Sequence, residues 1–155
     1  MAEPLKAIYH EAFIQSFADK VKGAYPSFDQ QAFIEAVLGP GWEELELKGR
    51  MRRITLSLGA TLPSEYERAL DILLAIYDTC SGFPYIFFPD FVEVYGVEDW
   101  ERSIAALAKF TRMSSSEFAV RPFLRMDQDR MLAQMLEWAD HPDEHVRRLA
   151  SEGCR

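Results

Sequence analysis

The sequence predicts an all-α protein built of stacked helical hairpins, and three observations support this fold class. Apolar residues recur at the three- and four-residue spacing of amphipathic helices along almost the whole chain. Short turns with glycine or proline interrupt this pattern, and no segment reads convincingly as a strand. The expected helices pair off about every 35–40 residues, which is typical of HEAT-like repeats in an α-α superhelix. Because the repeats do not visibly resemble one another, a single irregular helical bundle is the alternative.

Four helices are expected in the first half of the chain. An apolar stripe marks the first of them, at Ile8, Ala12, Phe13, Phe17 and Val21. The turn YPSFD precedes the second, which stops at Gly-Pro-Gly. Ser64, with Glu67 three residues later, is expected to cap the fourth. The expected ranges are 5–23, 29–38, 42–62 and 66–80.

The second half opens with SGFPYIFFPD (81–90), which is rich in aromatic residues and proline and is expected to be a buried, irregular connector. Ser115 or Ser116 should cap a helix through EFAVRPFLRM, and Asp127 should start the next. Pro142 should open the last helix, with Gly153 as its C-cap. The expected ranges are 90–95, 98–112, 117–126, 127–140 and 142–153.

The composition indicates a single globular domain over residues 1–155. No segment approaches the roughly 18–20 apolar residues that span a bilayer, and the N-terminus lacks the pattern of a signal peptide. The two cysteines, Cys80 and Cys154, lie far apart and match no metal or redox spacing. We therefore expect a reduced, cytoplasmic protein without a membrane partner, while the sequence leaves its oligomeric state open.

The net charge of −8 argues at first against nucleic acid, but the charge is unevenly distributed. Residues 1–108 hold 9 Lys or Arg against 17 Asp or Glu, whereas residues 109–155 hold 8 of each. Phosphates respond to the local potential within about 8–10 Å, so a cationic face near the C-terminus is compatible with the acidic total.

The run HPDEH (141–145) fits a zinc-peptidase pattern in which both histidines face the metal from one continuous helix. Pro142 directly follows His141, so His141 should fall outside the last helix and His145 near its start. We therefore predict no metal here, and no cofactor.

The run LELKGRMRR (45–53) places Lys48 and Arg52 on one side of a helix and Arg50 and Arg53 on the other. One interpretation is a solvated face that pairs with the preceding glutamates at i, i+4 spacing. The other is contact with backbone phosphates through Lys48 and Arg52.

Two glutamates each have an arginine one helical turn away. Glu117 is followed by Arg121 in the helix expected to begin beside it, and Glu152 follows Arg148 in the last helix. On spacing alone, these are two surface ion pairs, each contributing about 0–1 kcal/mol.

At this point the sequence resembles a known family. SSSEFAVRPFL (114–124) and EWADHPDEHVRRLASEG (137–153) are similar to the signature of the AlkC-type DNA glycosylases, alkylation-repair enzymes of the HEAT-like-repeat glycosylase superfamily. The similarity extends to LELKGRM, to the YPSFD turn and to the spacing of the early helices, so it covers essentially the whole chain.

The resemblance implies an enzyme that hydrolyses the N-glycosidic bond of cationic N-alkylated bases, such as 3-methyladenine or 3-methylcytosine, in double-stranded DNA. Glu117 and Glu152 match the family's acidic residues at the lesion, and Arg148 matches an arginine beside them. The predicted DNA-binding residues are Arg148, Arg147, Arg121, Lys48 and Arg52.

Members of the family continue past the last helix with further repeats, so we expect residues 1–155 to be the N-terminal part of a longer protein. A non-catalytic helical-repeat module that binds DNA or protein is the second hypothesis, because fold alone does not decide function. Trp138 is expected to be a core residue on its helical periodicity.

Overall fold

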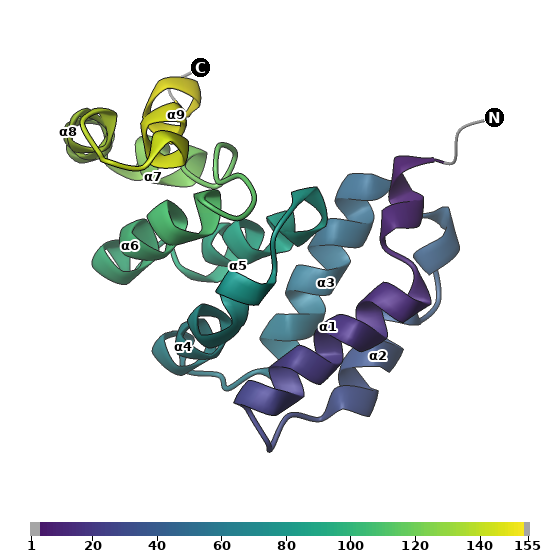
Figure 1. The fold of residues 1–155 in the computed structure, drawn as a ribbon. Helices are drawn as coiled ribbons and strands as arrows, with labels where there is room; N and C mark the ends of the chain where they lie inside the picture. The colour runs from purple at the N-terminus through teal and green to yellow at the C-terminus, as the bar shows by residue number, and fades with distance from the viewer. Residues whose placement is uncertain (1–3, 154–155) are drawn as a thin grey trace. The chain divides into compact units, whose positions relative to one another are not determined.

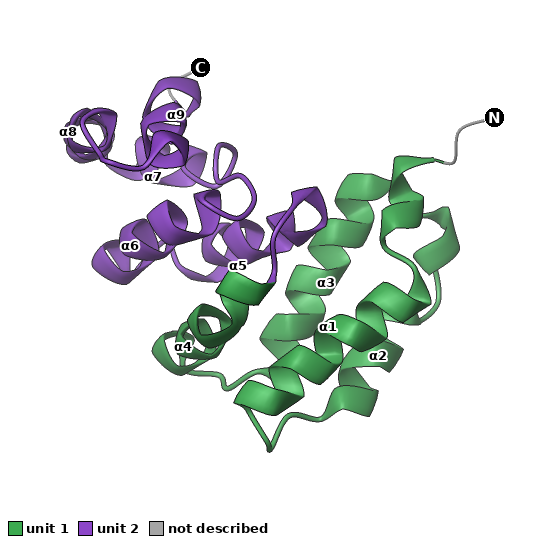
Figure 2. Ribbon diagram, in the orientation of Figure 1, with its two compact units in different colours: residues 1–79 green, residues 80–155 purple. Residues whose placement is uncertain are grey.

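The computed structural model describes residues 4–153, and every regular element in that range is helical. The prediction of an all-α protein is confirmed. The chain divides into two compact units, residues 1–79 and residues 80–155 (Figure 2). The single domain predicted for 1–155 stays a prediction.

In the described residues of unit 1, four α-helices pack together (Figure 1). Aromatic side chains form their core. The second helix packs against both the first and the third, and the first also packs against the fourth. Phe17, Phe28 and Phe33 fill the centre, each with at most 1% of its surface exposed. The helices are α1 (Glu11–Ala24), α2 (Gln30–Leu38), α3 (Leu47–Thr61) and α4 (Tyr66–Ile76), with 3-10 turns at Leu5–Ile8, Trp42–Glu44 and Tyr77–Thr79.

The helices predicted over 5–23 and 42–62 are each broken near their start, and one buried arginine contacts the chain at both breaks. Arg50 is 5% exposed. Its Nε donates to the Trp42 carbonyl at 3.3 Å, and its Nη1 donates to the carbonyls of Lys6 at 3.1 Å and Tyr9 at 3.4 Å. The carbonyls of Lys6 and Trp42 also accept the backbone N–H groups of Tyr9 and Leu45, so each is shared between a 3-10 turn and the arginine. Arg50 is therefore a structural residue and does not lie on a solvated face.

The predicted cap at Ser64 is also wrong. Glu65 occupies the N-cap position of α4, without a side-chain hydrogen bond. Glu67 is consequently the second residue of the helix, whereas a capping box requires the glutamate at the third. The helix α2 does begin with a side-chain cap, because the Asp29 side chain accepts from the Ala32 N–H at 3.0 Å.

Up to residue 153, where the described chain ends, unit 2 contains five α-helices. The fifth and sixth pack together, the eighth packs against the seventh and the ninth, and the ninth also packs against the sixth. The eighth starts next to Asp127, as predicted, and the Asp127 side chain caps it by accepting from the Arg130 N–H at 3.1 Å. The helices are α5 (Phe87–Tyr95), α6 (Trp100–Thr111), α7 (Arg121–Met126), α8 (Gln128–Ala139) and α9 (Glu144–Glu152), after a 3-10 turn at Phe83–Ile86.

The connector predicted over 81–90 is partly helical. Gly82 adopts a left-handed φ of 109°, and its N–H donates to the Met113 carbonyl at 2.7 Å. The helix α5 begins at Phe87, so Pro89 falls in a first turn, where a missing N–H removes no helical hydrogen bond. The prediction of burial is correct, because Phe87 and Phe88 are at most 2% exposed.

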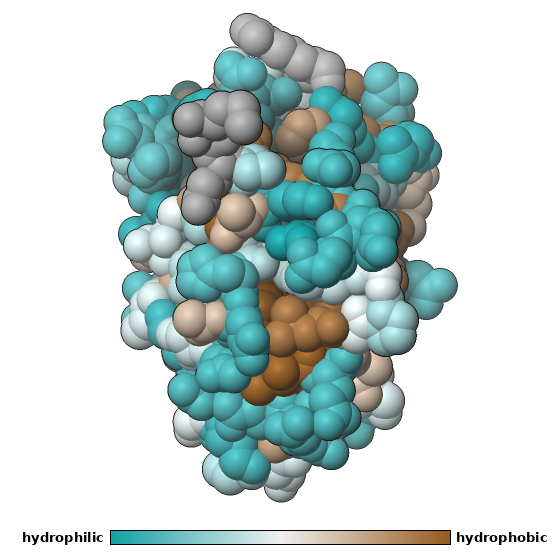
Figure 3. All heavy atoms as spheres, turned by 90° about the vertical axis from the view of Figure 1, so that its right-hand side faces the viewer, coloured by the Kyte–Doolittle hydropathy of each residue, from teal (hydrophilic) through white to brown (hydrophobic). Residues whose placement is uncertain are grey.

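The surface is mixed in character. The face drawn in Figure 3 is largely hydrophilic, with an apolar area framed by hydrophilic residues. Across residues 4–153, no helix combines the length and apolar character needed to traverse a lipid bilayer. Cys80 is buried, and Cys154 lies outside the described residues.

Replacing Arg50 should destabilise unit 1 strongly. Arg50→Met leaves three carbonyls without their charged donor and removes the guanidinium that lies 4.4 Å from the Trp42 ring centroid. We expect a loss of about 3–5 kcal/mol in the free energy of unfolding. Urea unfolding followed by circular dichroism measures this loss.

The matched control is Arg52→Met, which removes an exposed arginine of the same helix and should change the unfolding free energy by no more than about 0.5 kcal/mol. Equal effects of the two substitutions would contradict the structural role assigned to Arg50.

Candidate functional site

Glu117 lies in a turn that precedes α7, so the prediction that it occupies the first turn of a helix is wrong. The cause is Pro122, which lacks the N–H that a helix through 117–126 would need in its interior. The helix starts at Arg121 instead, which leaves Pro122 in the first turn. The chain before it forms a tight turn in which the Arg121 N–H donates to the Phe118 carbonyl at 3.2 Å.

The turn is anchored on both sides of Glu117. The Ser116 hydroxyl is completely buried and donates to the Leu107 carbonyl of α6 at 2.9 Å. Ala119 and Val120 are 3% and 0% exposed, so they belong to the core of unit 2. The position of Glu117 is therefore fixed by the residues that flank it.

The helix α9 begins with a strong N-terminal cap. The Asp143 side chain accepts from the His145 N–H at 2.8 Å and forms an ion pair with Arg112 at 2.9 Å. Desolvation alone would raise the pKa of Asp143, but the hydrogen bond from His145 and the charge of Arg112 together lower this pKa below its ordinary value. Arg112 comes from the end of α6, so this contact ties the start of α9 to that helix.

Arg148 forms an ion pair with one of the two predicted carboxylates, that of Glu117. Its Nε lies 3.8 Å from Oε1 of Glu117, whose side chain is 28% exposed, whereas the Arg148 side chain is 71% exposed. Glu152 is half-buried one helical turn beyond Arg148 on α9. Glu117 and Arg148 therefore meet where α9 approaches the turn at 117–120, and Glu152 follows Arg148 four residues later on the same helix. The ion pair that spacing predicted between Glu117 and Arg121 is replaced by this pair with Arg148.

Gly153 permits this approach. A Cβ at this position would lie 2.8 Å from Cγ2 of Val120, 2.8 Å from the Leu149 carbonyl oxygen and 3.1 Å from Cε of Met135. Gly153 is the C-cap of α9, as predicted. Its φ of −66° and ψ of −19° are ordinary helical values, so close packing and not a left-handed backbone requires the glycine here.

The other two predicted arginines of unit 2 have partners within the protein. Nη1 of Arg147 donates to the carbonyls of His141 at 2.8 Å and Pro142 at 2.9 Å, which holds the loop before α9. The guanidinium of Arg121 lies 4.7 Å from the ring centroid of Phe118. Both residues are exposed, and their roles in DNA binding stay predictions.

Lys48 and Arg52 belong to α3 of unit 1 and are both exposed. The neighbouring Arg53 donates to the carbonyls of Ala36 at 3.1 Å and Pro40 at 2.9 Å, so it also differs from the solvated residue expected of a charge run. Contact between phosphates and Lys48 or Arg52 stays a prediction.

The HPDEH run has the arrangement predicted for it. His141 precedes α9, and its Nδ1 accepts from the Asp143 N–H at 3.0 Å. His145 is the second residue of α9. Within residues 4–153, no three His, Cys, Asp or Glu side chains gather closely enough to hold a metal ion.

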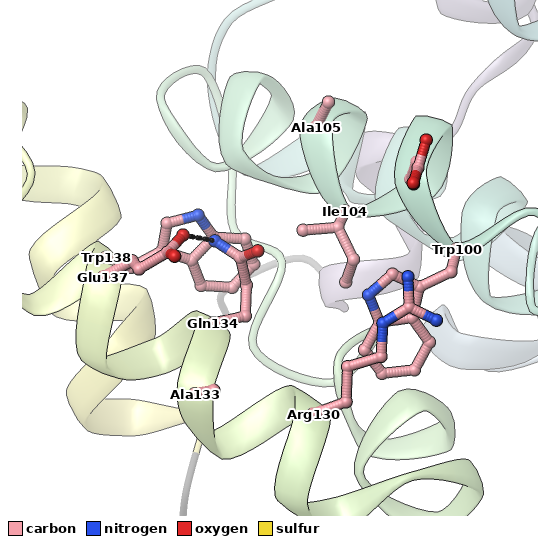
Figure 4. A pocket seen from close by; sticks show the side chains of 9 residues that line it. Trp100, Ile104, Ala105, Arg130, Ala133, Gln134, Glu137 and Trp138 are labelled. Atoms are coloured by element: carbon pink, nitrogen blue, oxygen red, sulfur yellow. Dashed lines mark hydrogen bonds between the residues drawn. The ribbon is translucent and has the colours of Figure 1, made fainter.

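An open pocket of about 500 Å³ lies between α6 and α8 (Figure 4). Its wall includes Trp100, with the Arg130 guanidinium 4.4 Å from the ring centroid, and Trp138, which is 5% exposed. The prediction that Trp138 is a core residue is confirmed. No predicted site residue lines this pocket, so it is separate from the cluster around Arg148.

Two carboxylates and one guanidinium give the cluster of Glu117, Arg148 and Glu152 a formal charge of −1. Such a cluster favours a cationic ligand, while the exposed guanidinium can bind an anion beside it. The sequence did not identify the exposed ring of Phe118 or the Arg112 contact. Spacing within one helix could not reveal either feature, because both depend on the turn at 117–120 or on contacts between helices.

The described part of the chain is thus a helical protein in which an exposed guanidinium pairs with a carboxylate from another segment. No family model matches the chain. The chain is 51% identical over 151 residues to the uncharacterized protein YhaZ of Bacillus subtilis strain 168, a match that covers 97% of this chain and 42% of that protein.

Among solved structures, the chain matches Pseudomonas fluorescens alkylpurine DNA glycosylase AlkC bound to DNA containing an abasic site analog. The TM-score is 0.95 with 42% identity, over 100% of this chain and 43% of that one. The resemblance to the AlkC-type glycosylases is thereby confirmed, as is the predicted class of stacked, HEAT-like helical repeats. The chain spans about two fifths of the length of both relatives.

Gly153→Ala should displace the end of α9. The added Cβ meets the fully buried Val120, which has no space to retreat into, so we expect a loss of about 1–3 kcal/mol in the free energy of unfolding. Gly23→Ala is the control, because a Cβ at Gly23 in α1 would meet nothing within 4 Å. That substitution should be neutral or stabilising by up to about 1 kcal/mol. Thermal unfolding of both variants tests the difference, and a neutral Gly153→Ala would disprove the packing constraint.

Proposed function

We propose that this chain acts in DNA alkylation repair, as part of a glycosylase that hydrolyses the N-glycosidic bond of cationic N-alkylated bases such as 3-methyladenine or 3-methylcytosine. Its partner is double-stranded DNA containing such bases, and its place of action is the cytoplasm. One observation carries the proposal: Arg148 reaches from α9 to Glu117, with Glu152 one turn further along the same helix.

The chemistry explains why carboxylates are needed. An N3-alkylated base already carries a positive charge, so it leaves without a strong general acid. The sugar left behind has oxocarbenium character, and a carboxylate is the group that glycoside hydrolysis uses to stabilise such a cation. Glu117 and Glu152 supply negative charge that is already in position before the bond breaks, which is the condition for effective electrostatic catalysis. One of them also orients the attacking water.

The arginines hold the DNA. Arg148 is mostly exposed, and its ion pair with Glu117 is long at 3.8 Å, so a phosphate can compete for its guanidinium at little cost. Arg121 is exposed in the same unit, and Lys48 and Arg52 are exposed on α3. Contacts of this kind position the duplex without reading its sequence. Arg147, whose guanidinium holds the loop before α9, contributes chiefly by supporting that helix.

Replacing either carboxylate should slow base release. Glu117→Gln and Glu152→Gln keep the shape of the side chain and remove its charge, and we expect the single-turnover rate of 3-methyladenine release from methylated DNA to fall by about 100-fold or more. Glu101→Gln on α6 is the control, because it removes an exposed carboxylate from outside the cluster.

The full-length Bacillus subtilis relative is assayed beside this chain. Release that is unaffected by Glu152→Gln would remove that residue from the mechanism. An absence of release from both wild-type proteins would favour a non-catalytic helical-repeat module that binds DNA or protein.

The two adjacent arginines of α9 should behave differently in DNA binding. Arg148→Gln should reduce the slope of log affinity against log salt concentration by about 1, because one phosphate contact is lost. Arg147→Gln should leave that slope unchanged and lower the free energy of unfolding by about 1 kcal/mol, because two loop carbonyls lose their donor. Titrations by fluorescence anisotropy over a salt series measure the slopes. If Arg147→Gln reduced the slope and Arg148→Gln left it unchanged, Arg147 would be the phosphate-binding residue and Arg148 would not.

A further inference from the structure

Phe118 is the residue next to Glu117, and its side chain points away from the core. It is 58% exposed, whereas the following residues of the same turn, Ala119 and Val120, are buried. Exposing a large aromatic side chain forgoes the stabilisation of about 1.5–3 kcal/mol that burying it would provide. Its position beside a candidate catalytic carboxylate therefore calls for an explanation from function.

The turn itself holds Phe118 outward. Ser116 before it is tied to α6 by its buried hydroxyl, and the two residues after it fill the core. Rotating the turn to bury Phe118 would bring Ala119 or Val120 to the surface and would break the Ser116 hydrogen bond. The exposed ring is thus presented by a rigid support, and it does not depend on a mobile loop.

A cation accompanies the ring. The Arg121 guanidinium lies over Phe118, 4.7 Å from the ring centroid. The pair offers an aromatic face and a positive charge together, which is the combination that proteins use to stack nucleobases and neutralise the adjoining phosphates. By comparison, the most exposed large apolar side chain in this unit, Leu136 on α8, offers neither a ring nor a π-face.

We propose that Phe118, held by Arg121, is a stacking platform for a nucleobase of the DNA beside the alkylated nucleotide. This inference rests on the proposed function and adds a binding residue to it. The ring stacks on the flat face of a base that has lost a neighbour in the helix, and Arg121 binds the phosphate next to that base. Phe118 is a positioning residue in this arrangement, because the charges that act on the sugar come from the glutamates.

The test is binding of the 155-residue chain to two duplexes, one with an abasic site analog and one intact, measured by fluorescence anisotropy. Phe118→Ala should weaken binding to the abasic duplex by about 5- to 150-fold. Phe118→Trp should bind within about twofold of the wild type, because it retains an aromatic face. Leu136→Ala is the control, since it removes a more exposed apolar side chain from the same unit, and it should bind as the wild type does.

Phe118→Leu separates stacking from simple apolar contact. We expect it to bind as weakly as the alanine variant, because it lacks a ring, and full affinity of the leucine variant would overturn the inference. So would binding of Phe118→Ala within twofold of the wild type, or an absence of binding by the wild-type chain. The thermal midpoint of each variant, which should stay at the wild-type value, verifies its folding.

Base release distinguishes this inference from the proposed function. If release of the alkylated base depends on Glu152 but Phe118→Ala binds DNA as the wild type does, the stacking platform is overturned and the glycosylase proposal stands. Weakened Phe118→Ala binding together with no base release by any variant would support the platform and count against catalysis.

Discussion

The candidate site depends on how closely the end of α9 approaches the turn at residues 117–120. Gly153 has no side chain, so α9 can pack directly against Val120 and Met135. From the same helix Arg148 pairs with Glu117, and Glu152 follows Arg148 one helical turn later. The buried Ser116 hydroxyl and the Arg112–Asp143 ion pair fix the same two segments from the side of α6. The catalytic geometry that we propose is therefore produced by packing between helices, and the charged residues themselves contribute little to it.

The sequence predicted the helices well and their ends less well, for a physical reason. Periodicity reports which face of a segment is apolar, and that signal located α2, α6 and α8 closely. At the breaks before α1 and α3, the Arg50 guanidinium binds carbonyls of three residues outside its own helix. Such a contact joins separate segments of the chain, so the spacing of residues within one helix cannot predict it. Only the late start of α7 could have been found locally, from Pro122.

The site was predicted by resemblance and not by spacing. Spacing paired Glu117 with Arg121, which would hold only if both lay in one helix. In the structure Arg148 is the partner of Glu117, and Arg121 lies over Phe118. The resemblance had already put Arg148 beside both carboxylates, since a family signature records three-dimensional proximity that a single sequence does not display. The sequence did not predict that Phe118 is exposed, because an aromatic residue in a helical pattern is normally a core residue.

The cap at the start of α9 determines how the site responds to acid. Because the pKa of Asp143 is lowered in the folded chain, its carboxylate contributes stability that is fully present above the ordinary value of 3.8 and is lost as the pH falls through the lower, folded value. Across the neutral and mildly acidic range the first turn of α9 therefore stays anchored to Arg112. This support at the start of α9 does not titrate near neutral pH, so a pH dependence of the proposed base release in that range would originate in other groups.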